Sequence, residues 1–182
     1  MSSAQLRPPV GERDHIAGPD DAPLTLVEYG DYECPHCARA HPIVEELQKM
    51  MAGRMRFVFR NFPLREAHPH AEHAAESAEW AGEYGKFWEM HDALFEHSGD
   101  GPGWLDDERL LGYASDLGLD PGDLLSALEE ERYRSRVRSD FMSGVRSGVN
   151  GTPTFFINGV RYDGSWELED LADALAGAAA SR

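Results

Sequence analysis

The chain has 182 residues, of which 41% are hydrophobic, and its 17 Lys and Arg against 33 Asp and Glu give a formal charge of -16. This hydrophobic fraction predicts one globular domain, with or without an insertion, and excludes a wholly disordered chain. An acidic surface repels phosphate backbones and anionic lipid heads, and no stretch approaches the roughly 20 apolar residues that cross a bilayer. We therefore expect no nucleic-acid partner and no membrane insertion.

Residues 1–22 form a polar lead-in that carries charges and prolines without an apolar core. They lack the basic start, the apolar run and the small-residue cleavage site of a secretion signal. If Met1 is the native start, we expect a cytoplasmic protein; if a leader has been trimmed, we expect an exported one.

The first predicted strand covers residues 24–29, a β-branched and apolar run that ends at Gly30-Asp31. Apolar residues then recur at helical spacing over 38–51, and Gly53 ends that helix. A second strand is predicted over 55–62. The segment between the first strand and the helix is short, so its residues fall at the first turn of the helix.

From residue 64 to about 148 the apolar pattern is almost wholly helical. Five helices are predicted there, over 71–81, 87–95, 110–117, 121–128 and 132–148. The fourth has Asp120-Pro121 at its start, a good cap followed by a good first residue.

A strand over 154–157 follows, then the hairpin turn Asn158-Gly159, a partner strand over 160–163 and an amphipathic helix over 168–175. This order predicts the α/β class, in which a helical insertion at 65–148 interrupts an α/β unit formed by 23–64 and 149–182.

Cys34 and Cys37 are the two cysteines, and they enclose Pro35 and His36 in a CxxC motif. At positions i and i+3 of a helix, both sulfur atoms lie on one face near the separation of a disulfide. So small a loop adds little chain-entropy stabilisation, which favours a reactive role over a structural one.

The start of a helix favours a thiolate, because its N–H groups are unpaired and its dipole is positive there. Such sites lower a thiol pKa from about 8.5 into the ~3.5–7.5 range. We expect an exposed Cys34 to attack a partner disulfide and a deeper Cys37 to resolve the mixed disulfide. Pro35 suits the first turn because it has no N–H, and a protonated His36 would add a positive charge beside Cys34.

A metal site is the alternative interpretation of the CxxC, since it supplies two of the four ligands that zinc normally needs. The remaining ligands would come from the histidines His41, His68, His70 and His73. No second CxxC and no regular Cys/His spacing supports this, so we expect no metal and no other cofactor. We expect the last three histidines to be exposed positions of an Ala-rich helix.

Pro153 stands at the entrance of the predicted strand over 154–157, where a proline indicates a special turn. A cis bond after Thr152 would turn the Thr152 backbone outward to pair with an extended peptide. A plain trans turn is the alternative.

Four motifs occur in the order typical of the DsbA-like branch of the thioredoxin superfamily, which the chain resembles over about residues 20–178. They are Leu26-Val-Glu-Tyr29 followed by CPHC, Arg60-Asn-Phe-Pro-Leu64, Gly85-Lys-Phe-Trp-Glu-Met-His91 and Gly148-Val-Asn-Gly-Thr-Pro-Thr-Phe-Phe-Ile-Asn-Gly159. The resemblance implies a thioredoxin-like fold with a helical insertion domain, and a cis Pro153 facing the cysteine pair. It also implies that Glu28 is a buried acid that assists proton movement around Cys37.

The sequence thus predicts a protein-disulfide oxidoreductase that exchanges disulfides with protein or peptide thiols and with a redox partner protein or glutathione. Its direction, oxidase against reductase or isomerase, stays open. A peptide-binding, chaperone-like module and a metal-binding stress protein, each with incidental cysteines, are the alternatives. We expect a monomer, because nothing resembles a dimerisation domain.

Overall fold

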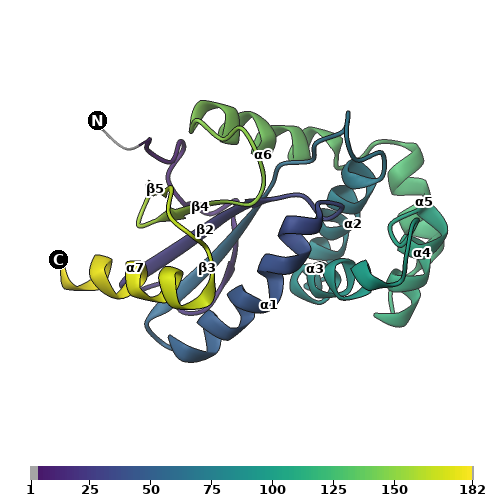
Figure 1. Ribbon diagram of the computed structural model, residues 1–182. Coiled ribbons are helices and arrows are strands. Elements are labelled where there is room, and N and C mark those ends of the chain that lie inside the picture. Colours follow the sequence, from purple (N-terminus) through teal and green to yellow (C-terminus); the bar gives the residue numbers. More distant parts are fainter. Residues whose placement is uncertain (1–3, 182) are drawn as a thin grey trace. The chain divides into compact units, whose positions relative to one another are not determined.

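The computed structural model describes residues 4–181, which form two compact units (Figure 1). Unit 1 contains the chain up to Gly30, Arg39–Arg60 and the chain from Met142 on, and unit 2 contains Asp31–Ala38 and Asn61–Phe141. The cysteine motif therefore belongs to unit 2. The predicted domain boundaries at residues 22, 64 and 148 stay a prediction about which segments fold together.

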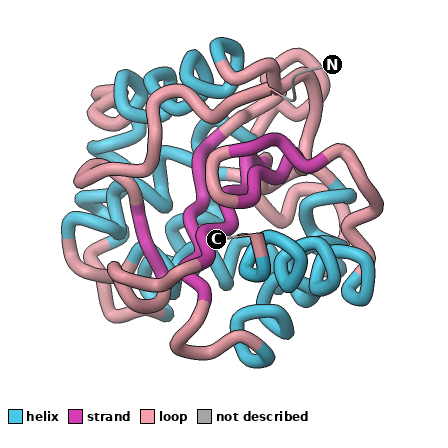
Figure 2. Tube along the Cα trace, turned by 90° about the vertical axis from the view of Figure 1, so that its left-hand side faces the viewer, coloured by secondary structure: helices cyan, strands magenta, loops and turns pink. Residues whose placement is uncertain are grey.

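A single five-stranded sheet is the centre of unit 1, and Figure 2 shows its strands gathered together. The strands are β1 (His15–Ala17), β2 (Leu24–Gly30), β3 (Met55–Asn61), β4 (Thr154–Ile157) and β5 (Val160–Tyr162), in the order β1-β3-β2-β4-β5. The pairs β1–β3, β2–β4 and β4–β5 are antiparallel, with Val27 opposite Phe156 in the second. The predicted α/β class is confirmed.

Strand β2 is buried along its whole length, as its continuous apolar run predicts for a strand covered on both faces. Leu26, Val27 and Tyr29 are fully buried. The hairpin between β4 and β5 turns at Asn158 and Gly159, with φ of 49° and 82°. Positive φ at both positions is what a two-residue hairpin turn requires, and the Asn-Gly pair predicts it.

Three helices contribute to unit 1: α1 (Pro35–Met50) from Arg39 on, α6 (Arg134–Arg146) from Met142 on, and α7 (Leu168–Ala180). Helix α7, yellow in Figure 1, packs beside β2 and buries Leu171 and Leu175. These two residues are four apart and so lie on the same face of the helix. The amphipathic helix predicted over 168–175 is thus confirmed, and it continues to Ala180.

Unit 2 is mainly helical. Its helices are α2 (Ala71–Glu83), α3 (Phe87–Glu96), α4 (Asp107–Asp116), α5 (Pro121–Glu129) and the first part of α6, with a short 3-10 turn at His97–Gly99. Helix α2 packs on α3 and α5, and α4 packs on α5. Asp120 caps α5 by accepting from the Gly122 N–H at 2.8 Å, with Pro121 at the first position, as predicted.

The N-terminal lead-in contains a strand that the sequence did not predict. Strand β1 pairs with β3, with Ile16 opposite Val58. Buried Arg60 on β3 holds the lead-in further, since its guanidinium binds the Asp14 carboxylate at 2.8 Å and donates to the Pro8 carbonyl at 3.0 Å. A three-residue strand has too few positions to show an alternating pattern, so sequence alone does not reveal it.

Candidate active site

The two cysteines lie at the start of α1, with Cys34 directly before the first helical residue and Cys37 in the first turn. The Cys34 carbonyl accepts from the Ala38 N–H at 3.1 Å, which is the first hydrogen bond of the helix. Cys34 therefore occupies the capping position, where the backbone N–H groups of the next residues lack helical partners. The predicted placement of the motif at the first turn is confirmed.

Cys34 is less accessible than the sequence analysis predicted. Its exposed fraction is 4%, against 0% for Cys37, whereas Pro35 and His36 are exposed. The prediction of an exposed Cys34 is wrong, although Cys37 is the deeper of the two. The Cys34 N–H donates to the Asp31 carbonyl at 3.1 Å, so the chain makes a tight turn directly before the helix.

The Asp31 side chain is fully buried and holds this turn through hydrogen bonds. Its carboxylate accepts from the backbone N–H groups of Glu33 and Leu64, each at 2.8 Å, and from His68 Nδ1 at 2.8 Å. The Asp31 N–H also points to Cys37 Sγ, at 3.5 Å. Burial raises the pKa of the Asp31 carboxyl, although these hydrogen bonds act to lower it.

His68 and His70 lie before α2 and not on it, so their predicted place on an Ala-rich helix is wrong. The His68 ring is 21% exposed and donates to Asp31, because an ionised carboxylate only accepts. His70 binds Glu33 twice, through its N–H at 2.7 Å and Nδ1 at 2.9 Å.

His73 does lie on α2, and its Nδ1 is 2.6 Å from an Asp107 carboxylate oxygen. Each of the histidines His68, His70 and His73 thus has one ring nitrogen on a carboxylate. The expectation that the chain carries no metal stays a prediction.

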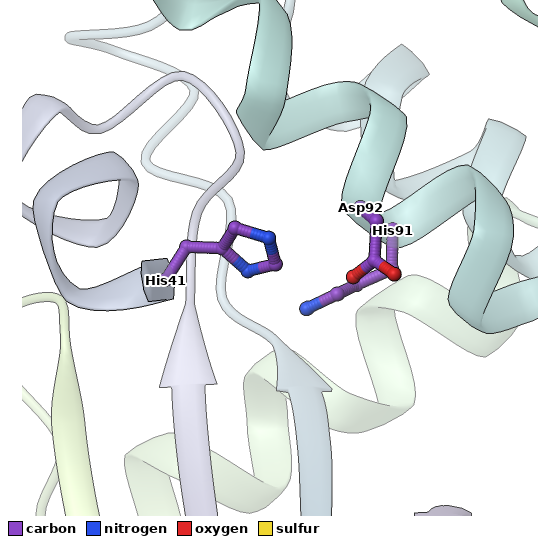
Figure 3. A group of neighbouring side chains, drawn as sticks. All are labelled: His41, His91 and Asp92. Atoms are coloured by element: carbon purple, nitrogen blue, oxygen red, sulfur yellow. The ribbon is translucent and has the colours of Figure 1, made fainter. Parts of the chain in front are cut away.

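Tyr32 anchors the cysteine loop to helix α3. Its hydroxyl is 2.9 Å from Nδ1 of His91, and its ring meets Phe95 at a centroid distance of 4.9 Å. Figure 3 shows His91 beside Asp92 on α3; His41, drawn with them, is on α1 and belongs to unit 1. His91 is 3% exposed, so the contact between Tyr32 and His91 is an interior one.

The remaining predicted site residues lie in unit 1. Glu28 is on β2 opposite Phe155 and is 2% exposed. Thr152 and Pro153 directly precede β4, and the peptide bond between them is cis, as expected. The roles of Glu28, Thr152 and Pro153 stay predictions.

Asp31 and Tyr32 were not predicted from the sequence as parts of the site, nor was the contact between His68 and Asp31. An acidic residue directly after a buried strand and four residues before a helix is a usable signal for Asp31. Nothing in the local pattern marks His68, because it lies 37 positions from its partner.

Among residues 4–181, no helix combines the length and the apolar character needed to span a membrane.

A buried strand leading into a CxxC at a helix start, beside an antiparallel strand entered through a cis proline, defines a protein with the thioredoxin fold. A family model described as thioredoxin matches residues 11–176, and the chain belongs to this family. It has the fold of the DsbA-like thiol-disulfide oxidoreductases, so the predicted resemblance is confirmed.

Two solved structures illustrate the likeness. BdbD from Bacillus subtilis, in its oxidised form, matches with a TM-score of 0.86, 26% identity and 98% of each chain covered. A variant of α-DsbA1 from Wolbachia pipientis matches with a TM-score of 0.80 and 22% identity, covering 100% of this chain and 98% of that one, which shows the fold.

The curated relatives are longer proteins. One from Salinispora arenicola (strain CNS-205), named Na(+)/H(+) antiporter NhaA 1, is 46% identical over 167 residues. That match covers 92% of this chain and 25% of the relative. The chain thus spans about a quarter of the length of such relatives.

Proposed function

We propose that the chain catalyses thiol–disulfide exchange with protein substrates through Cys34 and Cys37. The observation that carries this proposal is the position of Cys34 at the cap of α1 with Cys37 one turn further on. A sulfur atom at a helix N-terminus is stabilised as the thiolate, which is the form that attacks a disulfide.

In the reductive direction, the Cys34 thiolate attacks one sulfur of a substrate disulfide, forms a mixed disulfide and expels the other substrate sulfur as a thiolate. Cys37 then loses its proton and attacks the Cys34 sulfur, which releases the second substrate thiol. The enzyme ends as a disulfide and the substrate as two thiols. The same steps in reverse oxidise a substrate dithiol, with glutathione or a redox protein restoring the enzyme.

The neighbouring residues have proposed roles in these steps. His36, exposed in the first turn, would add positive charge near the thiolate when protonated, and Pro35 begins the helix without an N–H. We assign to Glu28 the transfer of the Cys37 proton. We assign to the backbone at Thr152 and Pro153 the pairing with an extended substrate peptide, as the resemblance implies.

Reduction of insulin and reactivation of a scrambled protein test the proposal. Cys34→Ser should abolish both activities, because it removes the attacking sulfur. Cys37→Ser should retain the attack and accumulate a mixed disulfide with substrate, because the resolving thiol is lost. An undiminished rate for Cys34→Ser would refute the enzyme and favour a peptide-binding module with incidental cysteines.

A further inference from the structure

The Asp31 carboxylate connects the cysteine loop to the segment that follows β3, all within unit 2. The backbone of Asp31 contacts both cysteines. Its carbonyl accepts from the Cys34 N–H at 3.1 Å, and its N–H lies 3.5 Å from Cys37 Sγ. Its side chain binds Leu64 and His68 from the later segment, both at 2.8 Å. The carboxylate therefore belongs to a residue whose own backbone contacts both cysteines.

We propose that His68, held by Asp31, is a positioning residue that controls the ionisation of Cys34 and through it the equilibrium of disulfide exchange. This inference rests on the proposed function. His68 acts by offsetting the charge of the buried Asp31 carboxylate, which it binds through Nδ1, and by adding a positive charge to the loop.

The charged groups that face His68 support this role. They are Asp31, Glu33 and Cys34, and all three favour the imidazolium form. Burial acts to lower the pKa of His68, but the hydrogen bond and charge of Asp31, with smaller contributions from Cys34 and Glu33, raise it above its usual value. Coupling between two sites is reciprocal, so a Cys34 thiolate that favours His68 imidazolium is favoured by it to the same extent.

The Glu33 carboxylate does not compete with Asp31 for the hydrogen bond of the His68 ring. Both of its carboxylate oxygens are bound by His70, at 2.7 Å and 2.9 Å, which leaves Asp31 as the hydrogen-bond partner of the His68 Nδ1. Without a cation at position 68, the buried Asp31 carboxylate would lie next to both cysteines uncompensated, and it would disfavour a thiolate there.

The test is His68→Asn, which keeps a side-chain N–H donor for Asp31 but cannot become positive. In a Cys37→Ser background, Cys34 is the one remaining thiol, and its ionisation is followed by thiolate absorbance and by the rate of alkylation against pH. We expect the pKa of Cys34 to rise by about half to one unit, a three- to tenfold loss of thiolate at a pH below that pKa. His73→Asn is the matched control, because His73 also binds a carboxylate through Nδ1 but has Asp107 as its partner.

The second readout is the redox equilibrium with glutathione in the protein that keeps both cysteines. Since destabilising the thiolate destabilises the dithiol form, His68→Asn should shift the equilibrium toward the disulfide by about three- to tenfold. That corresponds to about 15–30 mV for a two-electron couple. An effect of His68 on folding alone would change the urea midpoint and leave the potential and the pH profile unchanged.

A third readout needs no change at position 68. NMR titration of the His68 imidazole should give a lower pKa in Cys34→Ser than in the reduced parent chain, because the serine removes the thiolate. This measurement decides the matter if His68→Asn fails to fold. A parent chain that does not exchange with glutathione refutes the proposed function; a chain that exchanges normally, with the same His68 titration in Cys34→Ser, overturns the role of His68 and leaves the function standing.

Discussion

Glu76 on α2 makes the stability of the chain depend on pH in a way that one substitution removes. Its side chain is buried, and among residues 4–181 its Oε2 atom has no hydrogen-bond partner. Burial raises the pKa of this carboxyl from 4.5 to about 7, with Glu72 and Glu131 contributing and His73 and Arg134 opposing. The folded chain therefore holds this proton more tightly than the unfolded chain does.

The size of the effect follows from the two pKa values. The change from 4.5 to about 7, at roughly 1.36 kcal/mol per unit, corresponds to about 3 kcal/mol of unfolding free energy. Because the pKa is raised on folding, this stability is present below pH 4.5, falls as the pH rises through the interval up to 7, and is lost above it. A neutral glutamine resembles the protonated acid and does not lose its contribution.

Urea unfolding of Glu76→Gln and the parent chain at pH 5 and pH 8, both reduced, measures this effect. We expect similar stability at pH 5 and a gain of up to about 3 kcal/mol for the variant at pH 8. Glu96→Gln, at the exposed end of α3, is the control and should change stability equally at both pH values. A difference between Glu76→Gln and its parent that is the same at pH 5 and pH 8 would refute the reasoning.

Three further outcomes are expected. Iodoacetamide should label Cys34 before Cys37 in the folded, reduced chain, because only Cys34 has any exposed surface; peptide mapping that finds Cys37 labelled first would contradict the geometry. Tyr32→Phe should lower the unfolding free energy by about 1 kcal/mol, because it removes the buried hydrogen bond to His91, and an unchanged urea midpoint would count against that bond. Asp120→Ala should cost about 1 kcal/mol by removing the cap of α5, whereas Asp120→Ser should restore most of it.

Those parts of the fold that the sequence predicts are the ones that local patterns specify. The continuous apolar run of β2 and the Asn158-Gly159 turn each need only a few adjacent residues to be recognised. The CxxC at a helix start is local in the same sense, because Cys34 and Cys37 lie within one turn of each other. Such features follow from backbone geometry and do not require knowledge of tertiary contacts.

What could not be predicted depends on contacts between distant segments. The hydrogen bond from His68 to Asp31 spans 37 positions, and that between Tyr32 and His91 spans 59. No periodicity encodes which turn of a later segment meets the loop, so the partners of both histidines could not be predicted from the sequence. The 4% exposure of Cys34 likewise had to be read from the structure, because the position of a residue at a helix start does not say how much of its side chain is covered.

The segments of unit 2 that follow β3 therefore contribute side chains to the cysteine loop. They supply the partners of three consecutive loop residues: His68 for Asp31, His91 for Tyr32 and His70 for Glu33. Because the cysteine loop and these partners lie in the same compact unit, we expect substitutions of His68, His70 or His91 to alter the loop that carries the thiols. With the proposed role of His68, two chains with the same CxxC and the same sheet would differ in redox equilibrium through the residues of this segment, so we expect the motif alone not to determine that equilibrium.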